Sequence, residues 1–67
     1  MYEVQWHGLG QIKCHGKFNS LKEAQDSVLA WWKQNHFTPP YIRSYGENPI
    51  IWDYGSHTCF YHFVKEE

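Results

Sequence analysis

Cysteine and histidine recur in two short segments of the 67-residue chain, and both residue types can bind metals or take part in nucleophilic catalysis. The first segment is Cys14-His15 and the second is His57-x-Cys59-x-x-His62. Thiolates and imidazoles are common zinc ligands. Side chains alternate between the two faces of a strand, so residues an odd number of positions apart point to opposite faces. This separates Cys14 from His15 and Cys59 from His62. At most His57 and Cys59 could share an ion, so we predict no metal site and no cofactor.

The same opposed geometry argues against nucleophilic catalysis. His15 cannot activate Cys14 from the other face of a sheet, and Ser56-His57 lies in a turn without evident oxyanion donors. Gly8-Leu9-Gly10 leads into a strand rather than a helix, so it is a turn and not a phosphate-binding loop. The sequence therefore predicts that the protein is not an enzyme. Its two cysteines, Cys14 and Cys59, are expected to be free, buried thiols.

The elements that position these residues begin with a hairpin. Residues 2–7 alternate between apolar and polar side chains, a pattern typical of a half-buried strand. A three-residue turn at Gly8-Leu9-Gly10 would return the chain along a second strand. The pairs predicted across this turn are Trp6 with Ile12, Val4 with Cys14 and Tyr2 with Gly16.

A helix is predicted to follow the hairpin. In the segment Ser20-Leu21-Lys22-Glu23, the Ser20 hydroxyl can accept a hydrogen bond from the backbone of Glu23, as in a capping box. Helical periodicity places Leu21, Val28 and Trp32 on one apolar stripe, with Ala24 and Trp31 beside it. We expect the helix to end near His36, because Pro39-Pro40 cannot continue it.

Three more strands are predicted at about residues 41–45, 50–54 and 58–65. Gly55-Ser56 favours a type II′ hairpin that pairs Trp52 with Cys59 and Ile50 with Tyr61. The expected fold is a single α+β domain over residues 1–67: an antiparallel sheet of about five strands with one amphipathic helix packed on it, in the order ββαβββ.

Both faces of the C-terminal strands carry apolar side chains, and one helix can cover only one face. We expect the face of Trp52, Cys59 and Tyr61 to lie beneath the helix, because Asp53 on the other face would be costly to bury unpaired. The outward face would then be a protein-binding stripe made of Ile42, Ile51, Phe60, His62 and Val64. The reverse assignment exposes a platform on which single-stranded nucleic acid could stack, made of Tyr41, Arg43, Tyr45, Trp52 and Tyr61. In a third interpretation the N-terminal hairpin or strand twist covers the second face, and the aromatic residues are ordinary core and surface.

Charge and composition narrow the choice of partner. The net charge is −1 and the six basic residues are scattered along the chain, so attraction to a nucleic acid backbone is not strongly encoded. The longest apolar run, Val28 to Trp32, is far shorter than the roughly 20 residues that span a bilayer. No signal-peptide pattern follows Met1, so we expect a cytoplasmic protein that does not enter a membrane.

Size and aromatic content favour a binding role. A chain of 67 residues is near the lower limit for independent folding, so a folded partner or a second copy would add stability. Thirteen aromatic residues outnumber the ten Leu, Ile and Val residues. We predict a small protein-binding module, of the accessory or inhibitor type found among phage and mobile-element proteins, with an unidentified protein partner or a homodimer as its complex. Single-stranded nucleic acid is the alternative ligand.

Overall fold

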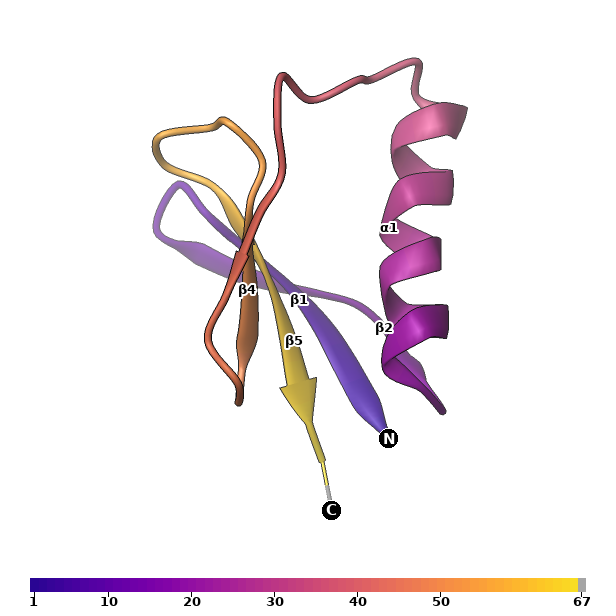
Figure 1. Ribbon diagram of the computed structural model, residues 1–67. Helices are drawn as coiled ribbons and strands as arrows, with labels where there is room; N and C mark the ends of the chain where they lie inside the picture. Colours follow the sequence, from indigo (N-terminus) through magenta and orange to yellow (C-terminus); the bar gives the residue numbers. More distant parts are fainter. Residues whose placement is uncertain (67) are drawn as a thin grey trace.

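The computed structural model describes residues 1–66, which form five strands and one helix in the predicted order. The elements are β1 (Tyr2–Gly8), β2 (Gln11–Phe18), α1 (Leu21–Gln34), β3 (Arg43–Tyr45), β4 (Ile50–Asp53) and β5 (Phe60–Lys65). The strands form one sheet in the spatial order β2-β1-β5-β4-β3, and every neighbouring pair is antiparallel. Figure 1 shows α1 along one side of this sheet, which confirms the predicted α+β fold.

The ends of α1 are set by local hydrogen bonds. The Ser20 hydroxyl accepts a 3.1 Å hydrogen bond from the Glu23 backbone N–H, as predicted for the N-cap. At the other end His36 adopts a left-handed conformation with φ 55°, and the Phe37 N–H donates to the Trp32 carbonyl at 2.8 Å. This pattern is a Schellman motif. The helix therefore ends two residues before His36 through its own C-cap, upstream of the two prolines.

The core lies between α1 and the inner sheet face, which we define as the face that α1 covers. Three helix residues are buried there: Ala24, Val28 and Trp32. The buried sheet residues opposite them are Val4, Trp52, Tyr61 and Phe63. Trp32 packs against both Trp52 and Tyr61, with ring centroids 6.0 and 5.8 Å apart. The prediction that Trp52 and Tyr61 lie beneath the helix is confirmed.

The register predicted for the first hairpin is wrong. The turn has two residues, Leu9 and Gly10, both with positive φ (52° and 73°), as in a type I′ turn. This shorter turn pairs Trp6 with Lys13 and His7 with Ile12. A bulge then shifts the register between Val4 and Gln5, and Val4 pairs with Gly16. Because a shift of one residue exchanges the two faces, Ile12 and Cys14 lie on the side away from α1.

The second hairpin is longer than predicted. Residues 54–59 connect β4 to β5, so that Trp52 pairs with Tyr61 and Ile50 with Phe63. The predicted partners of Trp52 and Ile50 lie two residues before the observed partners along the chain. A register shift of two residues keeps each side chain on its predicted face. Side chains order this loop: the Ser56 hydroxyl accepts from the Cys59 N–H at 3.2 Å. The Asp53 carboxylate accepts from the Gly55 N–H at 3.1 Å. The loop therefore replaces the expected Gly55-Ser56 turn.

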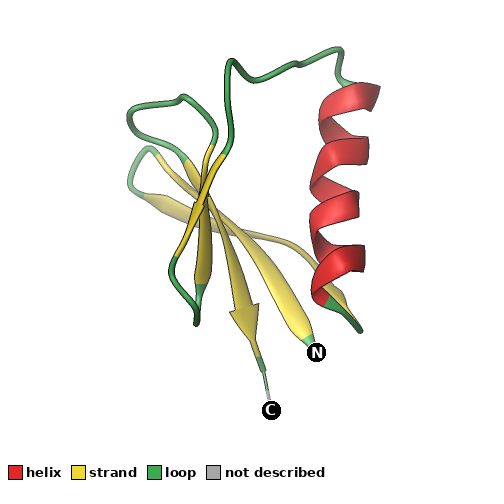
Figure 2. Cartoon of the chain, viewed as in Figure 1, coloured by secondary structure: helices red, strands yellow, loops and turns green. Residues whose placement is uncertain are grey.

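The loop from α1 to β3 crosses the same end of the molecule as the β4–β5 loop (Figure 2). The two loops touch at Gly55, where a methyl group would lie 2.6 Å from Pro40 Cγ. Gly55 also has a φ of 94°, which is favourable only for glycine. Gly55 is therefore needed both for its backbone conformation and for the close approach of Pro40. Within residues 1–66, α1 is neither long nor apolar enough to cross a membrane.

Candidate functional site: the outer sheet face

The side of the sheet opposite α1, here called the outer sheet face, is the candidate site. No element formed by residues 1–66 lies over it (Figure 1). Strand pairing assigns thirteen side chains to this face: Glu3, Gln5, His7, Ile12, Cys14, Lys17, Arg43, Tyr45, Ile51, Asp53, Phe60, His62 and Val64. The antiparallel registers fix which of these residues are neighbours.

One row of side chains crosses all five strands formed by residues 1–66. Pairing across the sheet runs Tyr45, Ile51, His62, Gln5 and Cys14 in that order. A second row crosses three strands, from Phe60 through His7 to Ile12. Ile12 is 65% exposed and Tyr45 is 49% exposed, whereas Ile51, Phe60 and Val64 are partly shielded by their neighbours. Apolar side chains therefore lie on β3, β4 and β5 and again on the far edge at β2, with the polar side chains of β1 between them.

Two histidines form the centre of the outer sheet face. The rings of His7 and His62 stack with their centroids 3.6 Å apart and their planes inclined by 14°. Partial burial, together with the neighbouring His7, lowers the pKa of His62 below its ordinary value. The environment therefore favours an uncharged His62.

A chain of hydrogen bonds orients the polar side chains of β1. The Gln5 amide donates to Glu3 Oε1 at 2.7 Å, and Gln5 Oε1 lies 2.9 Å from His7 Nε2. Hydrogen bonds from Gln5 and Cys14 are the main causes of a lowered pKa of Glu3. These contacts hold the Gln5 and His7 side chains in place beside the apolar residues.

Charges on the outer sheet face occur in opposite pairs near its margins. Arg43 pairs with Asp53 across β3 and β4, and Glu3 pairs with Lys17 across β1 and β2. The four charges sum to zero. The outer sheet face is therefore electrically balanced and has no basic stripe.

The structure brings together four of the five residues predicted for protein binding. Ile51, Phe60, His62 and Val64 all lie on the outer sheet face. Ile42 does not join them, because β3 begins at Arg43 and Ile42 belongs to the preceding loop. Four of the five predicted residues therefore share one face on β4 and β5.

The residues predicted for the alternative, nucleic-acid site are dispersed. Trp52 and Tyr61 are only 7% and 5% exposed and lie in the core. Arg43 and Tyr45 were predicted on the face of Trp52, but they pair with Asp53 and Ile51 on the outer sheet face. Tyr41 lies in the loop before β3, with the Arg43 guanidinium 5.2 Å from its ring centroid. These five residues therefore do not form one stacking platform.

Tyr45, His7 and Ile12 lie on the outer sheet face but were not among the residues predicted for protein binding. The prediction for Tyr45 is wrong because it sets Arg43 opposite Trp52, whereas Ser44 pairs with Trp52, and this shift of one residue exchanges the two faces of β3. The alternation of β1 does place His7 on the face away from the helix. Ile12 was assigned to the core because the turn at Leu9 was taken as one residue too long. Gly10 was a usable signal, since glycine favours the second position of a type I′ turn.

The cysteines and histidines considered at first do not converge. Cys14 and Cys59 are both free thiols, but Cys14 is exposed and Cys59 half-buried, so the prediction of two buried thiols is wrong. Residues 1–66 contain no group of three His, Cys, Asp or Glu side chains that could hold a metal ion together.

Comparisons with protein-family models, with curated proteins and with solved structures found no match to this chain.

Proposed function

We propose that the protein is a small, non-catalytic binding module whose outer sheet face docks on another protein. The observation that carries the proposal is a group of apolar side chains on β3, β4 and β5 (Tyr45, Ile51, Phe60 and Val64), with Ile12 on β2 beyond the polar side chains of β1, and no covering element among residues 1–66. In a two-layer fold the side of an antiparallel sheet away from the helix is usually polar. Apolar patches of this kind are typical of interfaces.

Charge balance favours a protein over a nucleic acid as the partner. Binding a phosphate backbone needs clustered basic side chains, whereas Arg43 and Lys17 lie on opposite edge strands of the sheet and each has an acidic residue as its partner in the strand register. The interaction expected here is apolar contact with little net charge. We therefore expect the partner to present an uncharged, apolar patch of its own.

The two histidines at the centre of the outer sheet face are also compatible with an uncharged, apolar partner. His62 is kept uncharged by its surroundings, so its ring and that of His7 can be covered without desolvating a full charge. Aromatic rings at the middle of an interface with polar edges are common among residues that dominate binding energy. His7 and His62 are thus the expected centre of the contact, with Ile51 and Phe60 beside them.

The experiment is an affinity capture from host lysate that compares wild type with three variants. Ile12→Asp and Tyr45→Asp place a charge at opposite edges of the outer sheet face, at positions exposed enough to leave the core intact. Leu29→Asp makes the same change at an exposed position on α1 and is the matched control. Circular dichroism and thermal melts would show that all three fold.

The proposal predicts one discrete protein that binds wild type and Leu29→Asp, survives nuclease treatment, and is lost or strongly reduced with both outer-face variants. Loss of all bound material on nuclease treatment would instead support the nucleic-acid alternative. Capture that is unchanged by Ile12→Asp and Tyr45→Asp would contradict docking through the outer sheet face. Sedimentation of the purified protein tests the homodimer, since a dimer broken by Tyr45→Asp would identify a second copy as the partner.

A further inference from the structure

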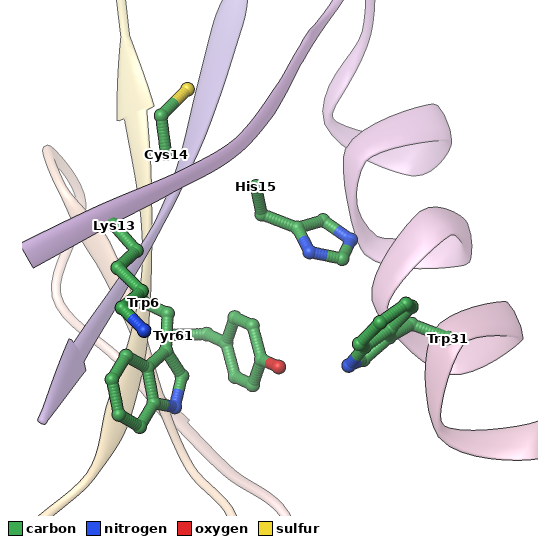
Figure 3. A pocket seen from close by; sticks show the side chains of 6 residues that line it. All are labelled: Trp6, Lys13, Cys14, His15, Trp31 and Tyr61. Carbon is green, nitrogen blue, oxygen red and sulfur yellow. The ribbon is translucent and has the colours of Figure 1, made fainter. Parts of the chain in front are cut away.

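A cavity on the inner side of the sheet is separate from the outer sheet face. It has a volume of about 340 Å³ and lies between α1 and the strands β1, β2 and β5. Its lining residues are Trp6, Lys13, Cys14, His15, Trp31 and Tyr61 (Figure 3). The Cys14 side chain points away from the other five in Figure 3, so the side chains that face the cavity are aromatic or basic.

Two features of the fold keep this space open. The two-residue turn places Lys13, rather than an apolar side chain, opposite Trp6 on the inner sheet face. The helix residue nearest the opening, Trp31, lies at the flank of α1 and stays 47% exposed, whereas the next residue, Trp32, fills the core. The core therefore stops at Tyr61, whose ring lies between Trp6 and Trp31 in Figure 3, and the cavity lies beside these three rings.

The walls of the cavity suit a flat aromatic ring. Trp6 and Tyr61 project from adjacent strands, and Trp31 faces them from the helix (Figure 3). His15 joins the helix wall to the sheet wall through edge contacts, 5.9 Å from Trp31 and 6.0 Å from Tyr61 between ring centroids. Aromatic rings pack against one another in edge-to-face or offset arrangements, which gives them an advantage over aliphatic groups of equal area. The volume is near the lower end of small-molecule pockets, which hold roughly 300–1,000 Å³.

The charge at the cavity selects an anion. The Lys13 ammonium lies 5.7 Å from the Trp6 ring centroid. Of the ion pairs formed within residues 1–66, none involves Lys13, and no carboxylate lines the cavity. The Tyr61 hydroxyl points from the sheet toward Trp31, and burial raises its pKa, so it stays protonated and can donate a hydrogen bond. Aromatic ring faces also attract cations, but the Lys13 ammonium already lies over Trp6 and would repel a ligand cation, whereas it would attract an anion.

We propose that this cavity binds a small planar aromatic molecule that carries one carboxylate or phosphate group, with its ring against Trp6, Tyr61 and Trp31 and its anion at Lys13. The proposal is independent of docking on the outer sheet face, because the two sites share no facing side chain. Two sources have this chemistry, an aromatic carboxylic acid and a mononucleotide, and separate probes distinguish them.

The test follows the indole N–H resonances of Trp6 and Trp31 by NMR during titration of the purified protein. Indole-3-acetate and adenosine 5′-monophosphate are the two anionic probes. Tryptamine carries a similar ring with a positive charge and is the matched control. We expect saturable shifts of the Trp31 and Trp6 signals with at least one anionic probe, and binding of tryptamine at least about fivefold weaker. The anionic probe that saturates identifies the source.

Variants then test the role of the charge. Lys13→Met keeps most of the aliphatic chain at an exposed edge position. We expect it to weaken binding of the anionic probe about fivefold and to remove the preference for that probe over tryptamine. Lys33→Met makes the same change on the exposed side of α1 and should alter neither. Absence of saturable shifts with both anionic probes, or equal binding of tryptamine to the wild type, would overturn the proposal.

Discussion

His7 on β1 and His62 on β5 stack ring on ring at the centre of the outer sheet face, with their centroids 3.6 Å apart. The two residues are not directly opposite each other, because His62 pairs with Gln5 and His7 with Phe60. The stack is therefore a diagonal contact across two strands, and the hydrogen bond to Gln5 orients the His7 ring. Two protonated rings at this distance would repel each other, so the contact is strongest when at least one is neutral.

The first prediction concerns pH. The pKa of folded His62 lies below its ordinary value of 6.5 because of burial and the neighbouring His7, so the unfolded chain binds this proton more tightly than the folded chain. The stabilisation is complete above pH 6.5 and is lost as the pH falls below it, by at most about 1.4 kcal/mol per pH unit for one proton. Urea unfolding at a series of pH values from about 5 to about 8 measures this slope.

A variant must isolate the contribution of His62 from the contributions of the other ionisable groups. His62→Gln removes the titrating group and keeps a polar side chain. The free energy of unfolding of wild type minus that of His62→Gln should decrease as the pH falls, because only wild type loses the contribution of His62. A difference that is constant across the range would contradict the assigned cause.

The second prediction compares two adjacent tryptophans on α1. Trp32 is 5% exposed and packs against four aromatic rings, whereas Trp31 is about half exposed. Trp32→Ala should lower the free energy of unfolding by about 3 kcal/mol or more, and Trp31→Ala by less than about 1 kcal/mol. Val28→Ala, at a fully buried position, should cost about 2 kcal/mol. Urea unfolding followed by circular dichroism gives all three values, and similar costs for the two tryptophans would contradict the packing of α1.

The third prediction concerns Leu9 in the β1–β2 turn. Leu9 has a φ of 52°, and its side chain is largely exposed, so it gains little from burial and bears the strain of a left-handed conformation. Leu9→Gly should raise the free energy of unfolding by about 1 kcal/mol, and Leu9→Asn should raise it by less. Thermal melts of both variants check this. A lower melting temperature for Leu9→Gly would mean that the hairpin has another turn.

The fourth prediction separates close packing from backbone strain at two glycines. Gly10 and Gly55 both have positive φ, but an added methyl group meets nothing within 4 Å at Gly10 and meets Pro40 at Gly55. Gly10→Ala should therefore cost about 1 kcal/mol from strain alone, and Gly55→Ala should cost more. Equal costs in chemical unfolding would show that the two loops do not touch.

The parts of the fold that depend on local chemistry could be predicted from the sequence. Ser20 and Glu23 mark the helix start, and the spacing of Val28 and Trp32 identifies its buried side. Residue type also separated the two faces of β4 and β5, because Trp52 and Tyr61 supply more apolar bulk than Asp53 and His62. The register error of two residues in that hairpin does not change which side chains face the helix, because a shift of two preserves the face.

The predictions of strand register that are wrong depend on one-residue differences in turn length. Leucine is an unfavourable residue at a positive φ, so nothing in Leu9 indicates the two-residue turn that moves Ile12 and Cys14 to the outer sheet face. The bulge near His15 corrects the register later in β2 and is equally hard to infer from alternation. The cavity beside Lys13 is a consequence of both features.

The most direct test of docking through the outer sheet face is calorimetric titration of the purified partner with wild type, Tyr45→Asp and Leu29→Asp. The account predicts that Tyr45→Asp weakens binding at least about tenfold, that Leu29→Asp leaves the affinity unchanged, and that added salt has little effect on wild type. Equal affinity for wild type and Tyr45→Asp, or loss of binding with Leu29→Asp alone, would place the contact elsewhere and contradict the account.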